Sequence, residues 1–249
     1  MTITEPEPVA APTPAPVPAP APRPPVVLFL PARDEEESVA GVVARVPTTV
    51  RGHPVVCIVV DDGSQDATAE RARAAGAEIV TVDDHHGLGA AVRRGLAEGA
   101  HRDAAAVAFC DADGEYAPEE LERMVAPILD GHADYVVGSR FAGRIDRMLP
   151  QRRVGNKVLT YALSGVTRRR LSDGQSGYRA LSPRAAEQAE IVHDFNYAQV
   201  LTIDLLRKGF RYAEVPISYH FRESGESFVR LVPYLRAVVP AVWRELRSR

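Results

Sequence analysis

The sequence predicts an α/β protein whose mostly parallel sheet is covered by helices on both faces. From Val26 onward, apolar runs of strand length alternate with segments of helical character. Each run is apolar almost throughout, which is the pattern of a strand buried on both faces and is typical of parallel sheets. The 249 residues also give enough mass to bury a large core. We therefore expect one α/β domain with flanking helices.

Local signals predict the individual elements in chain order. Acidic residues from Glu35 open the first helix, Asp66 is the expected N-cap of the second, and Pro118 stands in the first turn of a later one. After Ser139 the alternation breaks, and residues 140–155 are interpreted as irregular and basic. Strands are expected at 26–30, 55–60, 78–82, 105–110, 134–138 and 212–215, and helices at 35–46, from 66, at 89–99, from 117, at 154–166 and at 197–208.

The composition excludes some classes of protein. Hydrophobic residues make up 45% of the chain and charged residues 25%, as in an ordinary globular protein. The formal net charge of −3 argues against bulk binding of nucleic acid. Cys57 and Cys110 each lie in an apolar run, so we interpret them as buried thiols of a reducing compartment and not as a disulfide or a metal site.

The two ends of the sequence differ from its middle. Residues 1–25 hold ten of the twenty prolines and predict an extended tail, for which a docking role is the alternative to a passive one. Residues 229–249 predict an amphipathic helix that either packs on the domain or lies on a membrane surface. No run reaches the roughly 20 apolar residues that a membrane-spanning helix needs.

Four polar loops follow predicted strands at what should be one edge of the sheet, where α/β proteins bind ligands. In one of them Asp111 and Asp113 flank Ala112 directly after an apolar run. Two convergent carboxylates repel each other unless a cation lies between them, and hard divalent cations prefer oxygen ligands. For this pair alone, a turn that caps the next helix is the alternative. The other loops are 31–37 and 61–66, which are rich in acids, and 83–89, whose glycines open a helix.

These loops belong to an ordered set of motifs that resembles a known family, the inverting family 2 glycosyltransferases of GT-A fold. Within that family the resemblance is to the polyprenyl-phosphate (dolichol-phosphate) mannosyltransferase-like branch, and it covers about Val26 to Arg230. Any one motif is weak, but the ordered set is highly specific. The motifs are Pro31-Ala32-Arg33-Asp34-Glu35-Glu36 (P-x-x-N-E-E), 60–66 (V-D-D-G-S-x-D), 87–90 (G-x-G-A), 111–118 (D-A-D-G-x-Y-x-P), 138–140 (G-S-R), 173–179 (D-x-x-S-G-Y-R), 214–217 (E-V-P-I) and 222–227 (R-x-x-G-x-S).

The resemblance implies a role for each group of residues. A nucleotide-diphosphate sugar, a GDP- or UDP-sugar, would be the donor, and Mg²⁺ or Mn²⁺ held by Asp111 and Asp113 would meet its diphosphate. Asp113, Asp173 and Arg222 would be catalytic, and Arg140 would meet the phosphate of a lipid acceptor. The implied donor-binding residues are Pro31, Ala32, Glu35, Asp61, Asp62, Gly89, Asp111 and Ala112.

The resemblance leaves the acceptor open. A polyprenyl phosphate is already an anion and needs little help from a base, whereas a sugar hydroxyl needs a general base, for which Asp173 is the candidate. An Asx-turn is the alternative role of Asp173. Asp34, Leu201 and Phe228 depart from the family pattern and weaken the case for mannosyl transfer to dolichol phosphate specifically. A non-catalytic nucleotide-sugar-binding protein is the alternative from another class.

We expect the chain to divide into a tail at 1–25, a GT-A domain at 26–228 and the C-terminal helix at 229–249. Within the domain, 26–139 would bind the nucleotide-sugar and 140–228 the acceptor. The enzyme would work in the cytoplasm, at the inner face of the membrane if the acceptor is a lipid, in the synthesis of cell-envelope glycans.

Overall fold

The computed structural model describes residues 23–82, 87–191 and 197–221, which fold around one continuous sheet. The strand order is β2-β3-β1-β5-β7-β6-β8, and β4 pairs with β3. Neighbouring strands are parallel except where β2 meets β3 and where β7 meets β5 and β6. The strands are β1 (Val26–Ala32), β2 (Thr49–Val50), β3 (His53–Asp61), β4 (Glu78–Thr81), β5 (Ala106–Phe109), β6 (Tyr135–Ile145), β7 (Arg179–Leu181) and β8 (Tyr212–Tyr219).

The register of β1, β3 and β4 brings their carboxyl ends to one level, and β5 ends on the same side of the sheet. Ala32 at the end of β1 pairs with Asp61 at the end of β3, and Asp61 pairs with Thr81 at the end of β4. On the other side of β1, Phe29 pairs with Phe109, the last residue of β5. The loops that follow β1, β3, β4 and β5 therefore leave the same side of the sheet, which we call the carboxyl edge.

The short strand β7 joins the two halves of the sheet. Its central residue, Ala180, pairs with Ala108 of β5 and with Val136 of β6, antiparallel in both cases. β6 then pairs in parallel with β8, with an irregularity between Ser139 and Arg144. Because β7 runs against both of its neighbours, β5 and β6 run in the same direction, and β6 and β8 also end at the carboxyl edge.

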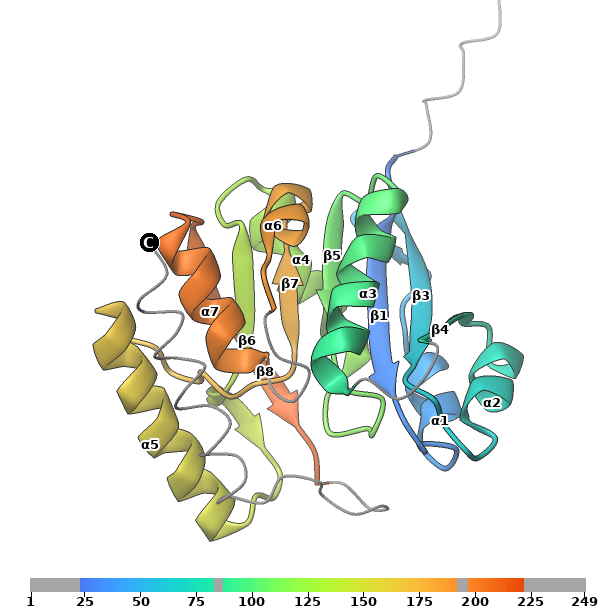
Figure 1. The fold of residues 1–249 in the computed structure, drawn as a ribbon, viewed down its shortest axis with the longest axis horizontal. Coiled ribbons are helices and arrows are strands. Elements are labelled where there is room, and N and C mark those ends of the chain that lie inside the picture. The colour runs from blue at the N-terminus through green and yellow to red at the C-terminus, as the bar shows by residue number, and fades with distance from the viewer. Residues whose placement is uncertain (1–22, 83–86, 192–196, 222–249) are drawn as a thin grey trace, which may run out of the picture.

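Helices cover both faces of the sheet, with α3, α6 and α7 in front and α4 behind in Figure 1. Successive residues of β1 alternate between two cores: Leu28 and Leu30 face the core with α1, α2 and α4, and Val27 and Phe29 face the core with α3, α6 and α7. This double burial is why the strands are apolar throughout. The helices are α1 (Val39–Val43), α2 (Thr68–Ala74), α3 (Leu88–His101), η1 (Pro118–Glu120), α4 (Leu121–Leu129), α5 (Pro150–Thr167), α6 (Pro183–Gln188) and α7 (Ala198–Arg207).

Helix α5 stands at one side of the molecule and packs on α7 (Figure 1). Its buried residue Leu163 lies in a small separate cluster with Leu171 and Ile203 of α7. Among the described helices, none combines the length and the apolar character that a bilayer crossing requires.

The predicted fold class is confirmed, and most of the predicted elements are present with shifted bounds. The prediction that residues 140–155 are irregular was wrong, because β6 continues to Ile145 and α5 begins at Pro150. Pairing with β8 satisfies the backbone there, although the side chains are largely exposed and gave no apolar signal. The first helix is α1 alone, shorter than the expected 35–46. β2, β7 and α6 were not predicted.

The N-cap prediction for the second helix was wrong by one position. Ala67 is the N-cap residue of α2, and no side chain caps it in the strict sense. Asp66 still binds the start of the helix, because its Oδ1 accepts a hydrogen bond from the N–H of Thr68 at 2.9 Å. Asp66 therefore supplies the expected hydrogen bond to the helix start, but from the position before the N-cap residue.

Candidate active site

The acid pair Asp111 and Asp113 lies at the carboxyl edge directly after the buried strand β5. Both side chains are partly exposed. Asp113 Oδ1 accepts a hydrogen bond from the N–H of Glu115 at 3.0 Å, and Gly114 between them has a φ of 79°, which only glycine adopts at no steric cost. The next helix, η1, begins only at Pro118 and has no side-chain cap. The pair therefore forms a turn of its own and does not cap that helix.

The carboxylate of Asp111 lies against a loop from the other half of the chain. A Cβ atom built on Gly177 would stand 2.6 Å from Asp111 Oδ2 and 3.1 Å from the ring of Tyr116, and the shorter of these is closer than real Cβ contacts come. The N–H of Gly177 also donates to the Tyr116 hydroxyl at 2.6 Å. The close approach of Asp111 therefore depends on glycine at position 177.

A third acid of the loop after β5, Glu115, is buried and paired with Arg152 in the first turn of α5. Arg152 Nη1 donates to Glu115 Oε1 at 2.6 Å and Nη2 donates to Oε2 at 3.2 Å, and Nη1 also donates to the Tyr219 hydroxyl at 3.0 Å. The Arg152 side chain is 40% exposed, so it remains accessible beside the acid pair. The sequence alone did not indicate this role, because the two partners are 37 residues apart and no local pattern links them.

Burial and the nearby charges together shift the pKa of Asp111. Burial raises the pKa of Asp111 to about 6, and the nearby charge of Glu115 adds to the rise, while Arg152 and Arg140 oppose it. Asp111 therefore takes up a proton at a higher pH than an ordinary aspartate does, and a bound cation would favour its ionised form.

The loops after β1 and β3 are tied to each other by hydrogen bonds. Asp34 Oδ1 accepts from the N–H of Gln65 at 2.7 Å, and the N–H of Asp34 donates to Ser64 Oγ at 3.1 Å. The N–H of Glu35 donates to Thr68 Oγ1 at 2.8 Å. Asp34 has a φ of 52°, in the left-handed region that Asn and Asp tolerate best among residues with a side chain. The departure from the family's Asn at this position is therefore compatible with the same backbone.

The paired acids after β3 bind backbone groups of the surrounding loops. Asp61 Oδ1 accepts from the N–H of Ser64 at 3.1 Å, and the Asp62 carboxylate accepts from the N–H of Gly87 at 3.0 and 3.3 Å. Gly87 is the N-cap of α3, and Gly89 lies buried in its first turn. The structure thus brings the predicted donor-binding loops together at the carboxyl edge. Residues 83–86 of the loop after β4 lie outside the described residues, as does Arg222.

Arg140 and Asp173, predicted on the acceptor side, form a buried ion pair. Arg140 Nε donates to Asp173 Oδ2 at 2.7 Å, and Nη2 donates to Oδ1 at 2.9 Å. Their side chains are 2% and 0% exposed. Burial alone would lower the pKa of Arg140, but the nearby Tyr116 and Asp173 raise it, so the guanidinium stays charged. Both oxygens of Asp173 are engaged by Arg140, a contact that sequence reasoning did not foresee.

Two further residues, which sequence analysis did not single out, hold the segment that carries Asp173. Glu214 of β8 accepts hydrogen bonds from the N–H of Ser172 at 3.0 Å and from the N–H of Asp173 at 3.3 Å. Arg179 is fully buried, and its Nε and Nη2 donate to the carbonyls of Ser176 at 3.0 Å and Gly174 at 3.2 Å. Glu214 belongs to the motif at 214–217 and Arg179 to the motif at 173–179. A motif does not show which backbone groups its residues bind.

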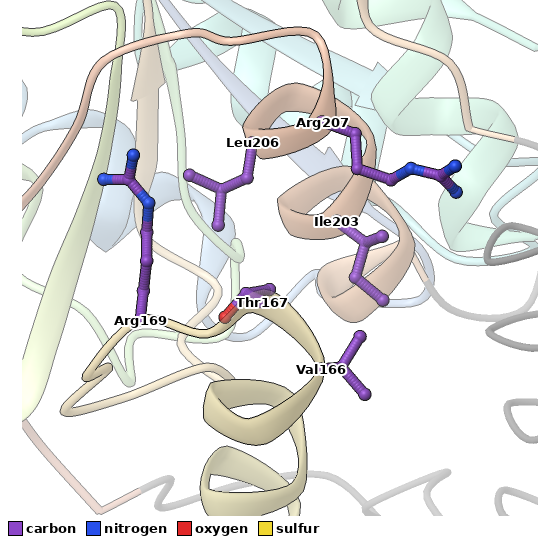
Figure 2. Close-up of a pocket in the computed structure, with 6 residues that line it drawn as sticks. All are labelled: Val166, Thr167, Arg169, Ile203, Leu206 and Arg207. Carbon is purple, nitrogen blue, oxygen red and sulfur yellow. The ribbon is translucent and has the colours of Figure 1, made fainter. Parts of the chain in front are cut away.

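A small hollow lies elsewhere, between the C-terminal ends of α5 and α7 (Figure 2). Because α5 begins just beyond the carboxyl end of β6, its C-terminal end is the one farther from the carboxyl edge. The hollow is therefore separate from the acid pair. Its lining residues are Val166, Thr167, Arg169, Ile203, Leu206 and Arg207.

The fold and the acid-bearing carboxyl edge define the class of protein as a GT-A glycosyltransferase. The family model "Glycosyl transferase family 2" matches residues 28–188. The chain belongs to glycosyltransferase family 2.

Named relatives agree with this assignment. The chain is 33% identical over 216 residues to polyprenol monophosphomannose synthase of Mycolicibacterium smegmatis, covering 81% of this chain and 79% of the relative. It is 32% identical over 202 residues to glycosyltransferase AglJ of Haloferax volcanii, covering 80% of this chain but only 64% of AglJ.

A solved structure shares the fold. Glucosyl-3-phosphoglycerate synthase from Mycobacterium tuberculosis, in complex with Mn²⁺, UDP and glucosyl-3-phosphoglycerate, superposes with a TM-score of 0.68 at 23% identity. The match covers 90% of this chain and 81% of that one.

Proposed function

We propose that this enzyme transfers a sugar from a GDP- or UDP-sugar to a polyprenyl phosphate at a membrane surface. The observation that carries the proposal is the position of Asp111 and Asp113, which stand at the carboxyl edge among the loops after β1, β3 and β4. The relative named polyprenol monophosphomannose synthase supports a lipid-phosphate acceptor.

The donor would lie across the loops of the first half. Pro31, Ala32 and Glu35 after β1 would line the nucleotide together with the acids after β3, and the N-terminus of α3 at Gly89 would face its phosphates. Ala112 is buried between the two acids and would leave room for the donor. The acids after β3 are Asp61 and Asp62.

A divalent cation, Mg²⁺ or Mn²⁺, fits the donor set at Asp111 and Asp113. Carboxylate oxygens are the ligands that these hard cations prefer. Within the described residues no three His, Cys, Asp or Glu side chains form a ready metal cage, so diphosphate oxygens of the donor would supply further ligands. A bound cation would stabilise negative charge on the departing diphosphate. The solved neighbour that contains Mn²⁺ and UDP supports this assignment.

The buried ion pair favours a phosphate acceptor over a sugar hydroxyl. Asp173 has both oxygens bound to Arg140, so it is poorly placed to take a proton from a hydroxyl. A phosphate oxygen needs no such base: it attacks the anomeric carbon, the bond from that carbon to the diphosphate breaks, and the configuration inverts. We infer that Arg140 and Asp173 position the acceptor loop, and that the exposed Arg152 meets the acceptor phosphate.

Arg222, which lies outside the described residues, would bind the donor diphosphate as the resemblance implies. With a lipid acceptor, the enzyme would work in the cytoplasm at the inner face of the membrane. Transfer assays with different donors would identify the sugar and the base.

The test is transfer of radiolabelled sugar from GDP- and UDP-sugars into polyprenyl phosphate. We expect Asp113→Ala to lose about 10²-fold or more of the activity while it keeps the wild-type circular dichroism spectrum, because charge stabilisation of the leaving group is lost. Arg152→Ala should raise the KM for polyprenyl phosphate more than it raises the KM for the donor. Full activity of Asp113→Ala would overturn the proposed site.

A matched control separates the site from its surroundings. Asp130→Ala removes an exposed acid that pairs with Arg51 on the other side of the domain. It should leave kcat and both KM values unchanged. Transfer to a sugar hydroxyl, but not to polyprenyl phosphate, would overturn the proposed acceptor.

A further inference from the structure

Helix α5 presents an apolar row to solvent. Val154, Val158 and Tyr161 recur at helical spacing, and they are 63%, 60% and 76% exposed. Leu149, just before the helix, is 42% exposed. Most of the exposed large apolar residues in the described part of the chain belong to this helix or its flanks.

The opposite face of α5 is already packed on the domain. Thr160 and Leu163 are buried there. A surface helix normally turns polar residues outward, whereas a helix that is apolar on both faces is covered on both. The apolar row therefore indicates a second partner for α5.

The charges around the row indicate the chemistry of that partner. The 18 residues of α5 include no Asp or Glu, and Arg153 and Lys157 are exposed beside the row. Residues 168–170, three consecutive arginines, follow the helix and are exposed as well. The chain as a whole has a formal net charge of −3, so this basic and apolar surface is opposite in sign to the whole chain.

We propose that α5 lies on the surface of an anionic lipid bilayer. Val154, Val158 and Tyr161 enter the headgroup region, and Arg153 and Lys157 bind lipid phosphates. A second copy of α5 would bring like charges together. The C-terminal residues 222–249, with six arginines and three glutamates, carry positive charge of their own and are a poorer match than an anionic surface.

A helix α5 that lies on the bilayer fits the proposed transfer to a lipid phosphate. The role of this membrane contact in catalysis rests on that proposed function. Arg152 in the first turn of α5 binds Glu115 beside the acid pair, so the helix runs along the bilayer from the candidate site. A lipid phosphate in the same leaflet would reach Arg152 without leaving the membrane surface. Membrane binding itself requires neither donor nor metal, so the two proposals can fail separately.

Flotation of the full chain with lipid vesicles tests the proposal without any measurement of transfer. We expect binding to vesicles with about 30% phosphatidylglycerol and much weaker binding to pure phosphatidylcholine, because cationic residues near an anionic surface add to the apolar term. Val158→Asp with Tyr161→Asp, and Arg153→Ala with Lys157→Ala, should each weaken binding about tenfold or more. Their circular dichroism spectra should match the wild type, because these side chains are exposed.

Arg73→Ala is the matched control, since it removes an exposed arginine from α2 at a distance from α5. It should bind vesicles as the wild type does. Unchanged binding in both α5 variants would overturn the proposal. So would loss of binding in Arg236→Ala with Trp243→Ala while the α5 variants still bind, which would assign the contact to the C-terminal residues. A dimer in solution that Val158→Asp dissociates would assign the row to a second copy.

Discussion

Gly177 links the two halves of the chain at the scale of a single residue. Its missing side chain lets the loop of residues 172–178 approach Asp111, and its N–H donates to the hydroxyl of Tyr116. In Gly177→Ala, the new methyl group would overlap Asp111 Oδ2 and displace the carboxylate. We expect about tenfold weaker binding of Mn²⁺, a loss of about 1.4 kcal/mol. Titration of Mn²⁺ in the presence of saturating GDP or UDP, followed by electron paramagnetic resonance, measures this directly.

Gly174→Ala is the control from the same loop. Its Cβ would meet Leu163 Cδ2 at 2.7 Å, at the end of an apolar side chain and not at an acid. We expect this variant to lower the thermal midpoint but to bind Mn²⁺ like the wild type. Equal Mn²⁺ affinity in both glycine variants would contradict a positioning role for Gly177.

At the scale of elements, the pair Asp134–Arg211 aligns the starts of β6 and β8. Asp134 Oδ2 accepts from Arg211 Nε at 2.8 Å, and Oδ1 accepts from Nη2 at 3.0 Å. These hydrogen bonds lower the pKa of Asp134. A lowered pKa in the folded state adds stability above the unfolded value of about 3.9, and this stability is lost as the pH falls through the folded value.

We therefore expect Asp134→Asn to be less stable than the wild type at pH 7 and to approach it as the pH falls below about 4. Urea unfolding at a series of pH values measures the difference. The double variant Asp134→Asn with Arg211→Gln should show the same pH dependence as the single one. A stability gap that persists unchanged in acid would show that the charge of Asp134 is not its source.

The same elements show what sequence alone can predict. Strands such as β1 and β3 carry long apolar runs because both faces of the sheet are covered, so the pattern is local and predicts them correctly. β7 is three residues long and contains the buried cation Arg179, which binds carbonyls of the preceding loop. The Arg140–Asp173 pair likewise joins residues 33 positions apart. Motifs marked these residues as important, but their contacts exist only after the sheet has formed.

At the scale of the whole molecule, the site depends on both halves of the sheet. The first half supplies the acid pair and the loops proposed to bind the donor, and the second supplies Gly177 and Arg152. β7 holds the halves together by pairing with β5 and β6. Ligands that bind at their junction should therefore stabilise the fold as one unit.

We expect nucleotide binding, metal binding and the stability of the fold to be coupled at this junction. A ligand that binds only the folded state stabilises it by about 2.7 kcal/mol at 100 times its Kd. For a domain of this size that corresponds to a rise of about 5–10 °C in Tm. We expect either GDP or UDP to give such a rise in the presence of Mn²⁺ and a much smaller one after EDTA treatment. In Asp113→Asn the nucleotide should shift Tm equally with and without Mn²⁺, because the cation that joins the diphosphate to the protein has lost a ligand. A nucleotide shift in the wild type that is independent of Mn²⁺ would contradict the metal bridge at Asp111 and Asp113.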